Sequence, residues 1–349
     1  LAPTLLTLLK DPNEQVEVRQ FAAEGLGRTP LESAIPVLIE GLSDPALELQ
    51  AACARALGLG RAAAGVDPLI ARLTDRTQAP EVRFHAAASL GRIGDPRAVD
   101  PLIGALEDPH PAVRSDAAEA LGRLEAVQAI APLAALAHTE PEDPLIRQAA
   151  VEALAWIAVA PTTLSDQAAT ALAAIRDLSH HPTSTIREAF ATAAGIAGDR
   201  DSLDELLVLL EDPDDPDVRA AAARALGQLR ATDAAEALAA TLTHGDEEDD
   251  VRSAAAWALA QAPIQAVGRT LVRSLRDELE TVRAQAALGL GTLRDRSAID
   301  PLLDCLDDPD GEVVRAALVA LRQIGDASVR GAVEGLLRSS VPLVRLAAA

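Results

Sequence analysis

The fold is decided by the stretch VRAAAARALGQL at residues 218–229. With Val218 counted as position 0, apolar or small residues fall at +4, +5, +8 and +11. At about 100° per residue, these positions lie on one side of an α-helix. An arginine stands at +1. The glycine at +9, Gly227, lacks a side chain and so lets another helix approach closely. The stretch predicts a helix built to pack against other helices, and the rest of the chain repeats it.

The same pattern recurs along the whole chain. Position 0 occurs eleven times, at spacings of 31 to 33 residues in most cases. The eleven copies start at Val18, Leu49, Val82, Val113, Ile146, Ile186, Val218, Val251, Val282, Val313 and Val344. So regular a period predicts an array of stacked repeats. Each copy reads as a helix A, a short turn and a helix B. For the copy at Ile146 we expect helix A at 126–138 and helix B at 144–158.

Turn residues mark the ends of both helices. Gly-Asp pairs such as Gly94-Asp95 follow B helices, and Asp-Pro pairs often follow A helices. Five copies have a proline two residues before position 0, and proline favours the first turn of a helix. These prolines are Pro80, Pro111, Pro144, Pro216 and Pro342. One spacing, from Ile146 to Ile186, lengthens to 40 residues. We therefore expect a single array over 1–349, with a longer spacer repeat near 159–182 that changes the local curvature.

The composition limits the class of protein and of partner. Of the 349 residues, 49% are hydrophobic and 1% are aromatic, and the net charge is −22. Binding to nucleic acid or to anionic membranes needs clustered Lys and Arg, so neither is expected; a basic protein partner is permitted. No signal peptide and no apolar run of membrane-spanning length is visible, which predicts a cytoplasmic protein without membrane insertion. Cys53 and Cys305 are expected to be buried thiols. Leu1 in place of methionine, and an end inside a helix, indicate a piece of a longer protein.

Two segments resemble a known family. The phrases EVRFHAAASLGRIGDPRAVDPLIGALEDPHPAVRSDAAEALGRL at 81–124 and PDVRAAAARALGQL at 216–229 resemble HEAT repeats. More narrowly, they are similar to the short HEAT-like repeat of phycobilisome lyases. The resemblance covers nearly the whole chain. It implies an all-α, right-handed α-solenoid (superhelix) of about ten HEAT-like helix-turn-helix repeats, with helix B inside and helix A outside. The family contains bilin lyases, assembly factors and plain scaffolds, so it implies a fold more than a function.

Candidate chemical motifs have structural alternatives. The arginine at +1 recurs in nine copies and is either a cationic ladder for an anionic ligand or, as HEAT-like repeats generally use it, a tie to an Asp in an adjacent turn. The six histidines lack metal-ligand spacing, and no phosphate loop or catalytic motif is found. We therefore predict no catalytic residue, no metal and no cofactor. The acidic runs at 211–217, 246–250 and 307–312 fall in A–B turns, as a solvated edge or a docking site for a basic partner.

The predicted core leaves positions +2, +3, +6 and +10 of helix B on the opposite side of the helix, which faces the concave side in a HEAT array. Most of the rare aromatic residues lie at these positions. Trp257, Leu288 and Val319 occupy +6 in three successive repeats. The other candidates for partner binding are Trp156 at +10, Phe84 at +2, and Phe21 and His85 at +3. These side chains either lean onto neighbouring B helices or bind a partner, because apolar patches on soluble surfaces usually bind something.

Two functions remain open. The first is a protein–protein interaction scaffold or adaptor without catalysis, whose concave face binds a protein that is basic or presents an apolar helix. The second is a bilin lyase or chromophore chaperone for phycobiliproteins, and this is the enzyme expected if the chain is one. That function needs a carboxylate near the pyrrole nitrogens and arginine on the propionates. Residues available for these roles are Asp116, Glu119, Glu152 and Arg224.

Overall fold

The computed structural model describes residues 2–29, 32–139, 142–245, 247–262 and 264–326, and its regular elements are all helical. The chain forms two compact units, Leu1–Leu178 and Ser179–Ala349. The first unit contains α1 (Ala2–Lys10), α2 (Val16–Gly27), α3 (Ile35–Gly41), α4 (Leu47–Leu59), α5 (Val66–Thr74), α6 (Pro80–Ile93), α7 (Val99–Ala105), α8 (Pro111–Arg123), α9 (Ile130–His138), α10 (Pro144–Val159) and α11 (Ser165–Arg176). The second contains α12 (Ser184–Ala197), α13 (Leu203–Leu210), α14 (Pro216–Gln228), α15 (Ala235–Thr243), α16 (Asp249–Gln261), α17 (Gly268–Ser274), α18 (Glu280–Leu293), α19 (Ile299–Asp304) and α20 (Gly311–Ile324).

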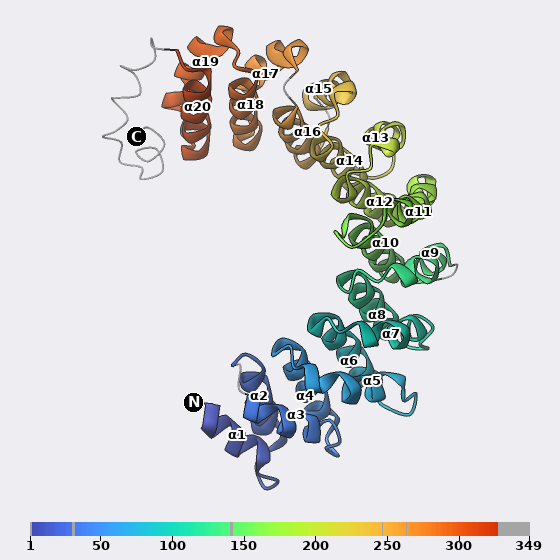
Figure 1. The fold of residues 1–349 in the computed structure, drawn as a ribbon. Coiled ribbons are helices and arrows are strands. Elements are labelled where there is room, and N and C mark those ends of the chain that lie inside the picture. Colours follow the sequence, from blue (N-terminus) through green and yellow to red (C-terminus); the bar gives the residue numbers. More distant parts are fainter. Residues whose placement is uncertain (1, 30–31, 140–141, 246, 263, 327–349) are drawn as a thin grey trace. The chain divides into compact units, whose positions relative to one another are not determined.

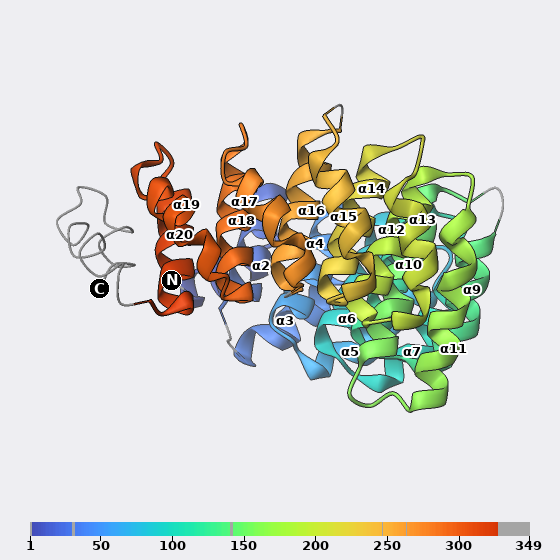
Figure 2. The ribbon, with the colours of Figure 1, turned by 90° about the horizontal axis from the view of Figure 1, so that it is seen from above.

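Within each unit the helices form two layers. The even-numbered helices are the predicted B helices and stack on one another, while the odd-numbered A helices pack against them on one side (Figure 1). Figure 2 shows the pairs of the second unit from α15 to α20 side by side. The all-α solenoid of about ten repeats is therefore confirmed. The predicted copy at Val344 lies outside the described residues, as does Pro342.

The core lies where the helical pattern places it. In α14, Val218, Ala222, Ala223 and Leu226 are fully buried, and Leu229 after the helix is 5% exposed. Phe190 of α12 is a core aromatic side chain with no exposed surface. The predicted thiols Cys53 and Cys305 are also buried and free. Burial raises the pKa of Cys53 to about 12 and that of Cys305 to about 11, so both stay protonated and unreactive at neutral pH.

Successive B helices approach each other at a glycine. A methyl group placed on Gly91 of α6 would stand 2.7 Å from the Cα of Ala120 in α8, and one on Gly291 of α18 would stand 2.6 Å from the Cα of Ala320 in α20. Non-bonded carbons prefer about 3.5–4.0 Å, so no side chain fits there. The contact joins position +9 of one repeat to +7 of the next. In one repeat position +9 is an alanine, Ala260, and position +7 of the next repeat is Gly289. The glycine of this contact therefore lies on the second helix in place of the first.

The predicted turn residues act as expected. The helices α6, α8, α10 and α14 begin at a proline. Gly94, Gly198 and Gly325 end B helices with φ of +83°, +66° and +72°, a region that glycine enters without steric cost. The side chain of Asp95 then accepts a hydrogen bond from the N–H of Arg97 and starts the short helix before α7. Each boundary therefore satisfies helix-end groups locally.

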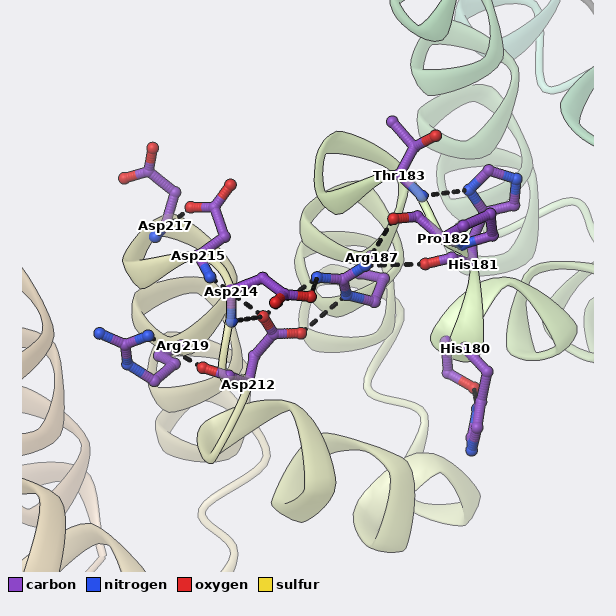
Figure 3. A network of polar contacts seen from close by, with 11 residues as sticks. His180, His181, Pro182, Thr183, Arg187, Asp212, Asp214, Asp215, Asp217 and Arg219 are labelled. Atoms are coloured by element: carbon purple, nitrogen blue, oxygen red, sulfur yellow. Dashed lines mark hydrogen bonds and ion pairs between the residues drawn. The ribbon is translucent and has the colours of Figure 1, made fainter.

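The arginine at +1 ties each repeat to the next. In Figure 3, Nε and Nη2 of Arg187 donate to both carboxylate oxygens of Asp212 at 2.7 and 3.0 Å, and Nη1 donates to the carbonyl oxygen of His181 at 2.9 Å. Arg83 binds Asp108 and Arg283 binds Asp308 with the same two-pronged geometry. The structural alternative for the ladder is thus confirmed for these repeats. The position of Arg345 lies outside the described residues.

Two repeats use a glutamate that the aspartate pattern does not predict. Arg114 binds both oxygens of Glu142 at 2.7 Å, and Arg219 binds Glu247. Where glutamine replaces the arginine, Gln50 donates to the carbonyl oxygen of Asp44 at 2.6 Å. Because Asp44 precedes α4, this bond lies within one repeat, and the tie between repeats depends on an arginine at +1 and a carboxylate of the next turn.

The spacer repeat is packed at its start. After α10, Thr163 donates a hydrogen bond to the carbonyl oxygen of Ile157 at 2.7 Å, and Thr162 donates to the carboxylate of Glu125 at 2.8 Å. The division between the two units follows Leu178, inside the range of the longer repeat predicted near 159–182.

Substitution of two helical glycines in the first unit tests the close approach. Gly91→Ala should lower the free energy of unfolding by about 1–3 kcal/mol, because the new methyl group overlaps the backbone of Ala120. Gly104→Ala in α7 meets nothing within 4 Å and should raise it by up to about 1 kcal/mol through helix propensity. Urea unfolding measures both. Equal effects of the two variants would contradict the proposed packing.

Acid should weaken the ties between repeats. Burial acts to raise the pKa of Asp212, but hydrogen bonds from Arg187 and from backbone N–H groups outweigh it and hold the pKa below its ordinary value. This contribution to stability is therefore complete above about pH 4 and is lost as the pH falls through the folded pKa. Asp212→Asn should cost roughly 3 kcal/mol at pH 7, since it leaves a buried arginine unpaired. Its melting temperature should fall less steeply below pH 4 than that of the unchanged protein.

Candidate functional site

The candidate site is the side of the B helices away from the A helices, called here the free face and defined by +2, +3, +6 and +10. Position +3 is only partly on this face. Five of its alanines are buried, because close stacking of the B helices covers their flanks: Ala52, Ala189, Ala221, Ala254 and Ala316. Positions +6 and +10 provide most of the accessible surface.

In the first unit the free face carries a chain of polar contacts across three helices. Glu24 of α2 forms an ion pair with Arg55 of α4, and Nη1 of Arg55 lies 3.2 Å from Nε2 of His85 in α6. Burial, followed by the charges of Arg55 and Arg92, lowers the pKa of His85 to about 4. Histidine is therefore neutral at pH 7. Because arginine can only donate, Nε2 accepts and the ring proton is on Nδ1.

The predicted aromatic residues of the first unit lie in different environments. Phe21 is 72% exposed. Phe84 and His85 are half-buried and meet edge to face, with ring centroids 4.3 Å apart. Trp156 of α10 is half-buried and rests on bare backbone, because a methyl group on Gly122 of α8 would stand 2.8 Å from its Cε3. Trp156 therefore leans on its neighbouring helix and still keeps accessible surface, and its contact with a partner stays a prediction.

Asp116 of α8 is an acidic residue of the free face with a raised pKa. It is half-buried beside Glu119, which is itself paired with Arg123. Burial, with a smaller effect of Glu119, raises the pKa of Asp116 to about 6, although Arg92 and Arg123 act in the opposite direction. A half-buried carboxyl group with a raised pKa is a candidate for contact with a ligand.

In the second unit the free face carries a run of three apolar residues. Trp257 of α16, Leu288 of α18 and Val319 of α20 occupy the same position on three successive helices, and all three are half-buried. Trp257 lies over Gly227 of α14, where an added methyl group would stand 2.6 Å from its Cζ3. The indole is thus sheltered on one side and does not stand free in water. We call Trp257, Leu288 and Val319 the apolar stripe.

The charge of the chain is not spread evenly over this face. In the ten described B helices, the free-face positions hold six arginines and five carboxylates, whereas the whole chain has a net charge of −22. The arginines are Arg28, Arg55, Arg92, Arg123, Arg224 and Arg315, and the carboxylates are Glu24, Asp116, Glu119, Glu152 and Glu188. The net negative charge therefore lies on the turns and the A helices.

The repeats match a known family. A family model described as HEAT repeats matches residues 2–79, 66–155, 105–193, 171–260 and 268–349. The chain belongs to the HEAT-repeat family. One curated relative, the deoxyhypusine hydroxylase of Gallus gallus, is 38% identical over 77 residues, which are 22% of this HEAT array and 26% of the relative. The array thus spans about a quarter of that relative.

Solved structures share the HEAT architecture. A chain in the structure describing Kap95p binding to RanGDP has a TM-score of 0.68 at 15% identity, over 99% of this array and 55% of that chain. The similarity shows the fold alone. The CpcE–CpcF complex of phycocyanin lyase from Nostoc sp. PCC7120 is 23% identical with a TM-score of 0.35, over 83% of this array and 94% of that chain. So low a score carries no argument about function.

Two further properties concern the described part of the HEAT array. It contains no group of three or more His, Cys, Asp or Glu side chains placed to hold a metal ion. None of its helices is long and apolar enough to cross a membrane.

One set of arginines at and beside the free face was not predicted from the sequence. Arg61, Arg92 and Arg123 from three successive repeats line one hollow. Arginine recurs at +10 as Arg28, Arg92 and Arg123, so part of the signal was visible in the sequence. The pattern did not show that Arg61, Arg92 and Arg123 line one hollow.

Replacement of Asp116 should change stability only where the carboxylate is charged. Because its folded pKa is raised, the fold loses stability as the pH rises from about 4 through 6. Asp116→Asn should therefore melt at a higher temperature than the unchanged protein at pH 8 and at nearly the same temperature at pH 4. Thermal unfolding over this range measures the difference. A difference independent of pH would show that ionisation is not its cause.

Proposed function

We propose that this HEAT array is a protein-binding scaffold whose apolar stripe receives an apolar helix of the partner. The observation that carries the proposal is the stripe itself, because Trp257, Leu288 and Val319 are partly accessible on three neighbouring B helices of a chain with 24% charged residues. Neighbouring helix axes lie about 8–10 Å apart, so the stripe extends for about 20 Å. An amphipathic helix presents apolar residues over such a length.

The charge distribution supports a partner of this kind. A strongly basic partner would be attracted to the acidic A–B turns, whereas the free face has nearly balanced charge. Around the stripe the side chains are mostly uncharged, with Gln228, Gln261, Thr292 and Gln323 at +10. Apolar contact with a polar rim is the usual composition of a binding interface.

A comparison of stripe variants tests this function. The triple variant Trp257→Ala, Leu288→Ser, Val319→Ser should capture the partner from a lysate at least about tenfold less efficiently than the unchanged array, in the range of lost interface anchors. Quantitative mass spectrometry of the captured proteins measures the loss. Binding by the isolated partner, once identified, gives the affinity.

The matched control lies in the same unit. Val208 of the A helix α13 is 61% exposed, so Val208→Ser removes an exposed apolar side chain off the free face. It should capture the same proteins as the unchanged array. Circular dichroism must show that the triple variant remains folded, because Trp257 also packs on Gly227. Equal capture by the triple variant and the control would reject the stripe as the binding surface.

A second candidate function is that of a bilin lyase or bilin chaperone of the phycobilisome-lyase type. The observation that favours it is the carboxyl group of Asp116 under the influence of Arg92 and Arg123, which are the group types that pyrrole nitrogens and propionates need. Mixing the array with a bilin separates the two functions. Neither a shift of the bilin absorbance nor its transfer to an acceptor protein is expected from a scaffold.

A further inference from the structure

The C-terminal ends of three B helices in the first unit enclose a cationic hollow of about 550 Å³. Arg61 follows α4, Arg92 lies in the last turn of α6, and Arg123 ends α8. The lining also includes Gly58, Gly91 and Gly94, and a methyl group added at Gly94 would meet nothing within 4 Å. Three guanidinium groups from three repeats therefore border one accessible space.

These arginines are available for a ligand. Within the described residues, neither the side chain of Arg61 nor that of Arg92 forms a hydrogen bond or an ion pair, unlike the arginines at +1. Arg123 is paired with Glu119 four residues earlier, but both side chains are more than 40% exposed. Such surface ion pairs contribute little to stability, so Arg123 can exchange Glu119 for a carboxylate of a ligand. Arginine binds carboxylates through two parallel hydrogen bonds.

A second hollow of about 390 Å³ continues the first. It is lined by Gly122, Arg123, Glu125, Trp156, Val159, Ala160 and Pro161, so Arg123 borders both spaces. The carboxylate of Glu125 accepts a hydrogen bond from Thr162. The exposed part of the indole of Trp156 thus lies next to the cationic groups. We call Arg61, Arg92, Arg123 and Trp156 the arginine edge.

The acidic turns do not cancel this local charge. They lie at the N-terminal ends of the B helices, and the arginine edge lies at the opposite ends. A helix of 13 residues such as α8 is about 20 Å long at 1.5 Å per residue, which is roughly two Debye lengths at physiological salt. An anion at the edge therefore feels the turns only through screened water. The nearer carboxylates are Glu119, which is paired with Arg123, and Glu125, which accepts a hydrogen bond from Thr162.

We propose that the arginine edge binds an acidic peptide segment of a protein partner, with carboxylates on the arginines and an apolar side chain on Trp156. The proposal rests on the scaffold function above and adds the chemistry of a second contact. An extended chain advances about 3.3–3.6 Å per residue, so acidic residues three apart match B helices about 10 Å apart. Charge complementarity supports this occupant, because three arginines line one hollow of a chain whose net charge is −22.

Tryptophan fluorescence of the full chain tests the proposal without an identified partner. The chain contains two tryptophans, so Trp257→Phe leaves Trp156 as the reporter beside the edge. Hexaglutamate, hexaglutamine and hexalysine are titrated at about 50 mM salt, where screening is moderate. Hexaglutamate should change the Trp156 emission saturably, and the effect should weaken as salt is added. Neither hexaglutamine nor hexalysine should produce it.

Variants separate a built site from general attraction. Arg92→Ala with Arg123→Ala should weaken hexaglutamate binding at least about tenfold, as expected for loss of charge-assisted pairs. Arg269→Ala with Arg273→Ala removes two exposed arginines of the A helix α17 and is the charge-matched control, with binding unchanged. Circular dichroism confirms that both double variants are folded.

Two results would overturn the proposal: no saturable response to hexaglutamate, or equal weakening by the two double variants. Either would leave the apolar stripe untouched, because the stripe is tested by partner capture in the second unit. Conversely, equal capture by the triple stripe variant and its control, together with intact hexaglutamate binding, would reject the stripe as the binding surface and keep the acidic-segment site.

Discussion

The close approach of successive B helices is the constraint on which the other contacts depend. A glycine at +9 meets a small residue at +7 of the next repeat, and at Ala260 and Gly289 the two sizes are exchanged without loss of the contact. Since no side chain separates the backbones, the alanine-rich faces bury one another completely. The same closeness brings the next A–B turn within reach of the arginine at +1. The packing and the ion-pair ladder are therefore one arrangement, and a larger side chain at +9 would disturb both.

The two ends of the B helices use charge differently. At the N-terminal ends, arginines are engaged by carboxylates of the next turn, as in Arg187 with Asp212, and the pKa of each carboxyl group falls because the pair favours its charged form. At the C-terminal ends of the first unit, Arg61 and Arg92 have no such partner among the described residues. The net charge of −22 thus describes the turns and A helices. It gives little information about the surface that is free to bind.

The free faces of the two units differ in chemistry. The first unit presents the Glu24–Arg55–His85 chain, the disturbed carboxyl of Asp116 and the arginine edge. The second presents the apolar stripe with mostly uncharged neighbours. A scaffold with two kinds of surface can hold a partner by an apolar helix and by an acidic segment. Each contact then contributes affinity, and the second adds specificity.

The sequence by itself determined the repeat, the helix boundaries and most buried positions, because each follows from a local period or a fixed turn residue. It left the arginine at +1 open between a ligand-binding ladder and a tie between repeats, which the contacts of Arg187 and Arg83 decided. The helices α9 and α10 begin and end within a few residues of the expected limits. Tertiary structure alone decided what depends on contact between repeats. Alanines at +3 are covered by neighbouring helices, Glu142 and Glu247 replace aspartate, and Trp156 and Trp257 rest on glycine backbone. The grouping of Arg61, Arg92 and Arg123 around one hollow is of the same kind, since a linear pattern records the face of a helix but not the distance between side chains on successive helices.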